Sequence, residues 1–328
     1  MKKKALVLGG GGFIGSNLVN YLKKKGYFVK AVDLKYPEFA ETKADEFIIG
    51  DLRKLFICRK VIENSFSEIY QLAADMGGAR YTFSGENDTK IVQNSALINL
   101  NVAKTLNKNK FPGIFFFPSS ACVYPKQNQK DAHRPNCTEE TAYPADPDSE
   151  YGWEKLFSER LYQSCMRNFG LNIRIARFHN VYGPLGIYDG GKEKAPAAIC
   201  RKVALSQDGE LIEIWGDGKQ TRSFLYIDEC LKGMQKLIRS KFQEPINIGS
   251  DRMVTINQLA KIAVKISSKN VRLTHVPGVQ GVRGRNSDNK LIKKVLKWAP
   301  SNDLERGMTK TYRWILSEIR KKHGSQNS

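Results

Sequence analysis

Long apolar runs are missing from this sequence of 328 residues. No stretch approaches the roughly 18 consecutive apolar residues of a membrane-spanning helix, so the sequence predicts no membrane partner. The lysines at positions 2–4 precede an apolar stretch at 5–8, which ends at once in four glycines. A secretory signal needs a longer apolar core and a cleavage site of small residues. The sequence therefore predicts a cytoplasmic protein.

Cysteine and histidine are also scarce, with six and four residues respectively. The cysteines are scattered, without a C-x-x-C pair and without a histidine at ligand spacing. Disulfide frameworks and zinc sites both depend on such spacing, so neither is predicted and no metal is expected.

Acidic residues are outnumbered, because 33 Asp and Glu stand against 53 Lys and Arg, giving a net charge of +20. Such a charge makes nucleic acid a candidate partner. The basic residues, however, are spread along the chain without a dense basic run or interleaved aromatic residues. We therefore predict a solvated, lysine-rich surface and no nucleic-acid partner. An anionic small substrate would also benefit from the positive charge.

Short apolar strands alternate with helical stretches through the first half of the chain. The predicted strands cover residues 5–8, 28–33, 47–52, 69–74 and 114–117, and the predicted helices cover 14–25 and 91–106. Repeated units of this kind predict an α/β protein with a Rossmann-type doubly wound parallel sheet. From about residue 177 the alternation becomes irregular, which indicates a smaller C-terminal lobe.

A glycine-rich turn separates the first predicted strand from the first helix. Gly9, Gly12 and Gly15 form G-x-x-G-x-x-G, and Gly10 begins an overlapping G-x-G-x-x-G. Glycines at these positions allow a tight turn and let a pyrophosphate approach the helix N-terminus. The second strand ends in Asp33, whose carboxylate suits ribose hydroxyls and repels a 2′-phosphate. This order of elements predicts NAD as the cofactor.

Tyr151 and Lys155 are four residues apart, a spacing that places both on one face of a helix. A nearby ammonium favours a phenolate, so we expect Lys155 to lower the pKa of Tyr151 and make it a general acid/base. Ser120 and Cys122 follow the fifth predicted strand. Ligands bind beyond the carboxyl ends of parallel strands, so these side chains should share one site with Asp33. Other residues expected at the same edge are Asp51, Ala73 and Ala74.

At these residues the chain resembles the extended short-chain dehydrogenase/reductase superfamily, and within it the NAD-dependent sugar-nucleotide epimerases and dehydratases. The general features are the glycine turn, Leu-Ala-Ala at 72–74, Ser-Ser-Ala at 119–121 and Tyr-x-x-x-Lys at 151–155. The specific features resemble the GDP-mannose 3,5-epimerase family and lie at 74–78, 120–125, 191–198, 215–224 and 281–289. The similarity runs from about residue 4 to about residue 321.

The resemblance implies epimerisation of a GDP-sugar, with GDP-mannose at C3, C5 or both as the expected substrate, giving GDP-L-galactose or GDP-L-gulose. NAD would take a hydride from C4 while Tyr151, beside Lys155, removes the hydroxyl proton and Ser120 orients it. The resulting ketone acidifies the hydrogens on C3 and C5. Cys122 as thiolate and Lys194 as ammonium would then act on opposite faces, one removing a proton and the other returning it.

The resemblance also implies which residues bind the two ligands. The cofactor residues are Gly9, Gly12, Phe13, Ile14, Gly15, Asp33, Asp51, Leu52, Leu72, Ala73, Ala74, Tyr151 and Lys155. The substrate residues are Gly77, Ser120, Ala121, Cys122, Asn180, Glu193, Lys194, Ala195, Lys202, Gln220, Thr221, Arg222 and Arg285. We accordingly expect an NAD-binding Rossmann domain with the catalytic side chains at 1–176. The lobe at 177–328 should mainly bind the sugar nucleotide, with segments that cross back to the first domain.

Several alternatives remain open. After Gly78 the epimerases continue with a Met-Gly-Phe-like segment, whereas this chain has a different sequence at 79–85, so the inverted carbon and the sugar are not fixed. A C4 oxidoreductase would share the fold without needing Cys122 and Lys194. A 4,6-dehydratase would usually carry an acidic pair where this chain has Ala121 and Cys122. A catalytically silent NAD-binding regulator is the alternative from a different class.

Each candidate also has a structural interpretation. By residue type alone Cys122 would be a packed core thiol and Lys194 a surface lysine, but position and resemblance favour chemistry. His179 is expected to be a structural hydrogen-bonding residue. The resemblance further implies a homodimer formed through the helix around 91–107 and the helix of Tyr151. An apolar face on the first of these helices suits either a core or an interface; it comprises Ile91, Ala96, Leu97, Leu100 and Ala103.

Overall fold

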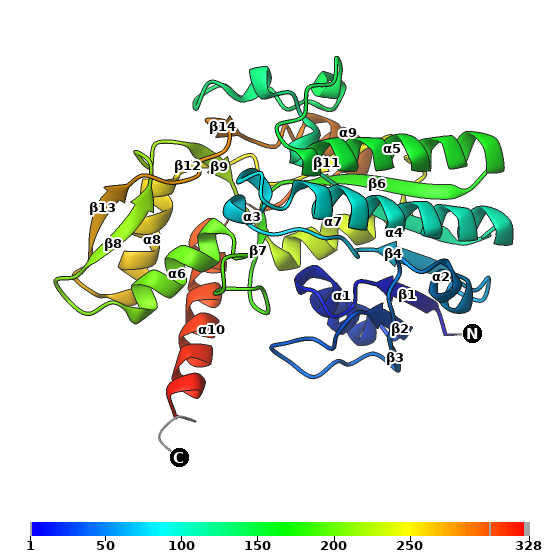
Figure 1. Ribbon diagram of the computed structural model, residues 1–328, viewed down its shortest axis with the longest axis horizontal. Coiled ribbons are helices and arrows are strands. Elements are labelled where there is room, and N and C mark those ends of the chain that lie inside the picture. The colour runs from blue at the N-terminus through cyan, green and yellow to red at the C-terminus, as the bar shows by residue number, and fades with distance from the viewer. Residues whose placement is uncertain (1, 302, 325–328) are drawn as a thin grey trace.

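A sheet of seven parallel strands forms the centre of the computed structural model, which describes residues 2–301 and 303–324 (Figure 1). The strand order is β11-β6-β5-β4-β1-β2-β3, so the winding direction reverses between β1 and β4. This arrangement confirms the predicted Rossmann-type doubly wound sheet. The strands are β1 (Lys4–Leu8), β2 (Phe28–Asp33), β3 (Glu46–Ile49), β4 (Glu68–Gln71), β5 (Ile114–Ser120), β6 (Asn172–Phe178) and β11 (Ile246–Ile248).

Helices cover both faces of the sheet because successive side chains of a strand point to opposite sides. In β5, Phe116 packs into one apolar cluster, while Phe115 and Phe117 pack into the other. The helices of the first face are α1 (Phe13–Lys24), α7 (Ile227–Arg239) and α9 (Lys290–Leu296). Those of the second face are α2 (Leu55–Val61), α4 (Asp88–Asn109) and α5 (Glu150–Phe169).

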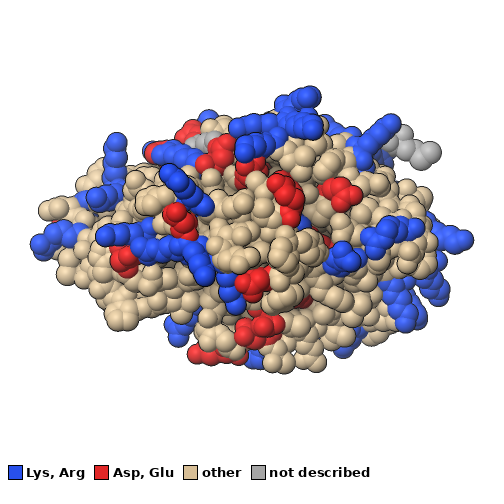
Figure 2. Space-filling model, turned by 90° about the horizontal axis from the view of Figure 1, so that it is seen from above, with Lys and Arg blue, Asp and Glu red and all other residues tan. Residues whose placement is uncertain are grey.

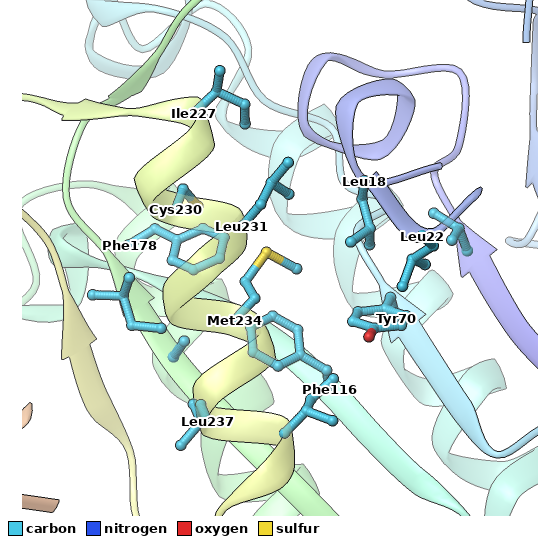
Figure 3. Close-up of a cluster of buried hydrophobic side chains, with 14 of the residues drawn as sticks. Leu18, Leu22, Tyr70, Phe116, Phe178, Ile227, Cys230, Leu231, Met234 and Leu237 are labelled. Carbon is cyan, nitrogen blue, oxygen red and sulfur yellow. The ribbon is translucent and has the colours of Figure 1, made fainter. Parts of the chain in front are cut away.

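The cluster on the first face joins distant parts of the chain. Figure 3 shows Leu18 and Leu22 of α1 beside Tyr70 of β4, with Met234 of α7 next to Phe116. All of these side chains are buried. Burial of large apolar side chains stabilises a fold by about 1.5–3 kcal/mol each, so this cluster anchors α7 to a sheet that is mostly N-terminal in sequence.

The smaller lobe has its own apolar core between helices and a pair of parallel strands (Figure 1). Its main elements are α6 (Ala195–Leu205), α8 (Ile256–Ser267), α10 (Leu304–Gly324), β8 (Leu211–Trp215) and β13 (Arg272–Val276). Between the lobe and the sheet lie short strands, which are β7 (Val181–Tyr182), β9 (Thr221–Ser223), β10 (Leu225–Tyr226), β12 (Met253–Thr255) and β14 (Gly284–Arg285). Short helices are α3 (Ala79–Phe83), η1 (Ala121–Val123), η2 (Lys126–Gln129) and η3 (Glu139–Ala142).

The N- and C-terminal parts of the chain are interwoven. Strand β6 continues past residue 176 to Phe178, and β11 completes the sheet from the C-terminal half. The polypeptide therefore enters the smaller lobe, returns to the sheet and leaves it again. This places residues of both parts along the same edge of the sheet.

On the face seen in Figure 2, charged side chains are distributed rather than gathered in one patch. Figure 2 shows Lys and Arg across the visible face, with acidic side chains between many of them. Within residues 2–301 and 303–324, no helix is long and apolar enough to cross a bilayer.

Candidate active site

The turn between β1 and α1 is shaped to receive a pyrophosphate. Gly9 has a φ of +88°, and a Cβ there would lie 2.6 Å from the backbone nitrogen of Ala73. A Cβ on Gly15 would collide with the carbonyl oxygen of Gly9. Helix α1 begins at Phe13 with Gly12 as its N-cap, no described side chain caps the helix, and its first turn lacks acids. Its N-terminal amides therefore suit an anionic ligand.

Asp33 lies beside this turn, at the end of β2. Its carboxylate accepts hydrogen bonds from the backbone nitrogens of Gly11 at 2.9 Å and Leu34 at 2.7 Å. Burial raises the pKa of Asp33, while these backbone N–H groups oppose the rise. An acid fixed next to the glycine turn is what the ribose of NAD requires, so the residues present fit this cofactor.

The other predicted cofactor residues lie along the same edge. Asp51 follows β3, and Arg53 binds its carboxylate through Nη2 at 2.8 Å. Leu52 is buried, and the backbone of Leu72 donates to Leu8 at 2.7 Å. Phe13 and Ile14 open α1, and Ala73 and Ala74 continue from Leu72 past the end of β4.

Helix α5 places Tyr151 against the end of β5. The helix is capped by Ser149, whose hydroxyl accepts from the backbone nitrogen of Gly152 at 3.2 Å. Gly152 packs on the carbonyl of Cys122 so closely that a Cβ would collide with it. The Ser120 side chain interacts with the Tyr151 hydroxyl and lowers the pKa of the phenol, an arrangement that suits general acid/base chemistry.

The electrostatics of Tyr151 differ from the sequence-based expectation. Burial raises the pKa of Tyr151, the charges of Cys122 and Glu154 raise it further, and the Ser120 hydrogen bond lowers it. Lys155 Nζ lies 5.6 Å from the centroid of the Tyr151 ring and 3.6 Å from the Glu154 carboxylate. Because the buried carboxylate offsets the charge of Lys155, desolvation dominates instead of the ammonium.

Cationic side chains surround the Cys122 sulfur. Arg285 donates to it from Nη1 at 3.2 Å. Burial lowers the pKa of Lys194, and the charge of Cys122 opposes that effect. Burial likewise lowers the pKa of Arg222 to about 10, and the charge of Cys122 again opposes that effect. Reactive cysteines typically lie in positive surroundings of this kind, whereas packed structural thiols do not.

An apolar wall, missed from the sequence, borders the same sulfur. Cys122 and Tyr151 pack in one cluster with the partly buried side chains of Met76, Tyr81 and Phe83. Tyr81 and Phe83 belong to α3, inside the segment 79–85 that departs from the epimerase pattern. That departure was the available signal, but the sequence alone did not indicate what the segment contacts.

Helix α3 is tied to the loop that carries Lys194. The Tyr81 hydroxyl donates to Asp75 at 2.8 Å, and the ammonium of Lys192 lies 3.9 Å from the centre of the Tyr81 ring. The backbone nitrogen of Gly78 donates to the carbonyl of Lys192 at 2.9 Å, and Gly78 also packs on the carbonyl of Glu193. These contacts connect the apolar wall to the loop that carries Lys194.

The two predicted substrate arginines lie opposite each other on neighbouring strands. Arg222 in β9 pairs with Arg285 in β14. Arg222 also donates from Nη2 to the carbonyl of Val282 at 2.6 Å. Next to it, the buried Oε1 of Gln220 has no hydrogen-bond partner among the described residues. An orphaned buried acceptor at this position suits a polar ligand.

The remaining predicted substrate residues are held within the smaller lobe or at its border. Lys202 donates to the carbonyl of Glu213 at 2.7 Å, and burial lowers the Lys202 pKa. Asn180 donates to the carbonyl of Ser223 at 2.9 Å, and Glu193 accepts from the backbone of Gly191 at 2.6 Å. The others occupy segment ends or tight packing positions, which are Gly77 against Tyr81, Ala121 in η1, Thr221 in β9 and Ala195 at the start of α6.

His179 is a structural residue, as expected. Its imidazole is fully buried and shares a hydrogen bond with Asn247 Oδ1 at 2.9 Å. Burial lowers the pKa of His179 to about 4, so the ring is neutral near pH 7.

A second feature missed from the sequence is a strap formed by residues 183–191. The strap lies against the start of α1, since Asn17 donates to the carbonyl of Pro184 at 3.1 Å and Gly186 lies against the ring of Phe13. Further on, the ring of Tyr188 packs against Phe39, which follows Asp33. The strap runs directly into Glu193 and Lys194, so one segment borders both the cofactor site and the reacting side chains.

Together, a doubly wound sheet, a glycine turn with its acid, and a Ser–Tyr–Lys group define an NAD-binding enzyme of the short-chain dehydrogenase/reductase type. The chain belongs to the NAD dependent epimerase/dehydratase family, which matches residues 5–249, and NAD is its cofactor. It is 44% identical to the GDP-mannose 3,5-epimerase of Arabidopsis thaliana over 97% of this chain and 83% of that protein.

Solved structures share the fold over nearly the whole chain. UDP-glucose 4-epimerase of Thermotoga maritima has a TM-score of 0.85 at 24% identity, covering 96% of this chain and 99% of its own. UDP-glucuronic acid 4-epimerase of Bacillus cereus, solved with UDP-glucuronic acid and NAD, has a TM-score of 0.79 at 25% identity with the same coverage. The chain is thus a sugar-nucleotide epimerase by family.

Proposed function

We propose that this enzyme epimerises GDP-mannose at C3, C5 or both, giving GDP-L-galactose or GDP-L-gulose. The observation that carries the proposal is the second set of reactive groups around Cys122. A dehydrogenase needs only the group of Ser120, Tyr151 and Lys155, but here a thiol and a partly buried ammonium adjoin it. Lys194 lies near enough to Cys122 for the charges of the two groups to interact, which supports a shared site.

The chain's own residues account for the proton movements. The Tyr151 oxygen takes the proton of the C4 hydroxyl, while Ser120, whose side chain interacts with Tyr151, orients that hydroxyl. Bound NAD supplies the reversible oxidation at C4. A ketone there acidifies the neighbouring C–H groups, and Cys122 removes a proton from one face. Lys194 delivers a proton to the opposite face, because inversion requires two groups rather than one.

The smaller lobe is proposed to bind the GDP portion of the substrate. Arg222 and Lys202 supply positive charge for the diphosphate, and Gln220 offers its orphaned carbonyl oxygen. Asn180, Glu193 and Thr221 are proposed to hold the sugar or the nucleotide. In this division, residues 1–176 form the NAD-binding domain, and residues 177–328 mainly form the substrate lobe.

The test is incubation of the purified enzyme with GDP-mannose in D₂O, followed by NMR of the sugar protons. New GDP-hexose signals with deuterium at C3, C5 or both are expected, and the labelled positions identify the inverted carbons. Absence of deuterium and of new sugars would contradict the proposal. Cys165→Ala is the matched control, because Cys165 is buried in α5 away from the reacting groups and should leave labelling unchanged.

The alternative reactions give different products in the same experiment. A C4 oxidoreductase would change C4 without deuterium at C3 or C5. A 4,6-dehydratase would lose the C6 hydroxyl. A silent NAD-binding regulator would do neither. The pairing of Cys122 with cationic neighbours favours the epimerase over all three, since none of them needs this group.

We also propose a homodimer. Exposed apolar side chains lie on the adjoining helices α4 and α5, with Leu97 at 40%, Leu100 at 44% and Phe157 at 47% exposure (Figure 1). Ile91 and Ala103 of the same predicted face are instead buried in the protomer. Exposed apolar side chains on two neighbouring helices suit an interface with a second copy. The six cysteines are all unbridged, which supports a reducing compartment such as the cytoplasm.

A further inference from the structure

Arg285 makes a set of contacts that its predicted role in substrate binding does not explain. The side chain is nearly buried, with 6% exposure. All three nitrogen atoms of its guanidinium donate hydrogen bonds to other side chains of the protein. Nε donates to Gln129 Oε1 at 2.6 Å, Nη1 donates to Cys122 Sγ at 3.2 Å, and Nη2 donates to Asp148. A buried cation needs such compensation, and here two of the contacts are made by residues with no other role in the site.

Gln129 is held so that it presents an acceptor to Arg285. The residue is fully buried, and its Nε2 donates to the carbonyls of Tyr124 at 2.9 Å and Pro125 at 3.3 Å. With the amide nitrogen committed to two carbonyls, the amide oxygen must point the other way. It therefore fixes Nε of Arg285.

Asp148 fixes the other end of the guanidinium. Its side chain has 1% exposure, and its second carboxylate oxygen accepts from the Ser149 hydroxyl at 3.0 Å. Ser149 caps α5, the helix of Tyr151. Asp148 thus connects the orientation of Arg285 to the start of the catalytic helix.

We propose that Asp148 and Gln129 are positioning residues that hold Arg285 with Nη1 directed at the Cys122 sulfur. A guanidinium is planar and rigid, so fixing Nε and Nη2 determines where Nη1 points. The hydrogen bond from a cation then stabilises the anionic sulfur. This inference rests on the proposed role of Cys122 as an acid/base, and it adds a supporting pair that acts through Arg285.

Other groups facing the sulfur remain in place when Asp148 or Gln129 is changed. They are Lys194 at the start of α6, Arg222 on β9 and the phenol of Tyr151 on α5. Because Gln129→Met changes no charge, altered thiol reactivity in that variant reports the Arg285 contact rather than the general charge of the site, whereas Asp148→Asn also removes a negative charge.

The test is the rate of Cys122 alkylation by iodoacetamide between pH 6 and 10, a range that brackets the ordinary thiol pKa of about 8.5. The NAD-loaded enzyme is used without sugar, and peptide mass spectrometry identifies the alkylated site. Asp148→Asn should slow alkylation about tenfold near pH 7, and the difference should shrink above pH 9, where ordinary thiols ionise without help. Gln129→Met keeps the side-chain volume but removes the acceptor, and should slow alkylation about threefold near pH 7.

Asp217→Asn is the matched control. Asp217 forms a two-fold hydrogen-bonded pair with Arg283, two residues before Arg285, at 2.8 and 2.7 Å, but this pair is exposed. Asp217→Asn changes the net charge of the protein by the same amount as Asp148→Asn. This control variant should leave the alkylation profile of Cys122 unchanged.

Unchanged profiles in both test variants would overturn the proposal, as would faster alkylation at every pH, which is what a merely structural loosening produces. If Asp148→Asn does not fold, as judged by NAD content and thermal unfolding, Gln129→Met decides alone. Because no sugar is present, failure of this test is separate from failure of GDP-mannose epimerisation.

Discussion

The rings of Phe39 and Tyr188 lie 5.5 Å apart, although one follows β2 and the other lies on the strap before α6. Trp314 of α10 packs edge-on against both, at 5.3 Å from Phe39 and 5.6 Å from Tyr188. This aromatic group fastens the strap to the loop that begins at Asp33. The strap therefore borders the NAD site on one side and is anchored to the smaller lobe on the other.

Phe39→Ala should weaken retention of NAD. Aromatic pairs contribute about 0.5–1.5 kcal/mol each beyond burial, so loss of both contacts should weaken NAD binding about tenfold. The measurement is NAD released per protomer on denaturation of the purified protein, together with the NAD dissociation rate. Phe169→Ala, an exposed aromatic residue at the end of α5, should retain wild-type NAD content. Equal retention in both variants would show that the strap does not hold the cofactor.

Cys122→Ala should abolish epimerised product while leaving reduction of bound NAD by GDP-mannose measurable. The C4 step depends on Ser120, Tyr151 and Lys155, which this change leaves intact. Loss of one of two proton-transfer groups should lower the epimerisation rate by at least about a hundredfold. Near-ultraviolet absorbance reports reduced NAD, and NMR reports the product. Full product formation would remove the thiol from the mechanism.

Lys194→Met should abolish epimerisation and stabilise the fold by about 1 kcal/mol, because removing a partly buried functional charge typically gains stability at the expense of activity. Burial lowers the pKa of Lys194, so the folded protein disfavours the ammonium. The gain in the free energy of unfolding of Lys194→Met should be largest at pH values below the lowered pKa of Lys194, where the folded wild type must keep the ammonium. The gain should shrink as the pH rises from that pKa towards 10.5, because Lys194 then loses its proton in the folded protein before it does so in the unfolded chain. Urea unfolding at pH 7 and 10 gives the comparison. A destabilised variant would contradict this account.

His179 should make the protein acid-sensitive. Burial lowers its pKa from 6.5 to about 4, so between these values the unfolded chain binds a proton that the folded chain does not. Stability should therefore fall with falling pH, by about 1.4 kcal/mol per pH unit across this window. In His179→Gln the fall between pH 6.5 and 5 should be shallower than in wild type. His275→Gln, at an exposed position, should keep the wild-type slope.

Phe157→Glu should convert the proposed dimer into a monomer. Phe157 is 47% exposed on α5, the helix that adjoins α4 and its exposed leucines, and a buried unpaired carboxylate at an interface is strongly unfavourable. Light scattering measures the mass directly. Leu205→Glu changes a 50% exposed residue in the smaller lobe and should leave the mass unchanged. A wild-type mass for Phe157→Glu would place the interface elsewhere or exclude it.

The sequence by itself determined the local features of this protein. The strands, the glycine turn with Asp33, and the helical spacing of Tyr151 and Lys155 follow from short-range patterns, because glycine geometry and side-chain periodicity act over a few residues. Five strands and two helices predicted this way are present within a few residues of their predicted bounds. Family resemblance then supplied the residues that no local pattern marks, such as Lys194 and Arg285.

Only the tertiary structure decided what surrounds those residues. Desolvation, which depends on everything packed around a group, raises the pKa of Tyr151, although sequence spacing suggested that Lys155 would lower it. Arg285 meets Cys122 across 163 residues of chain, and Asp148 and Gln129 approach it from two further segments. Contacts of such separation arise from the winding of the sheet and the return of β14, because burial and long-range packing are properties of the folded chain and not of any segment of it.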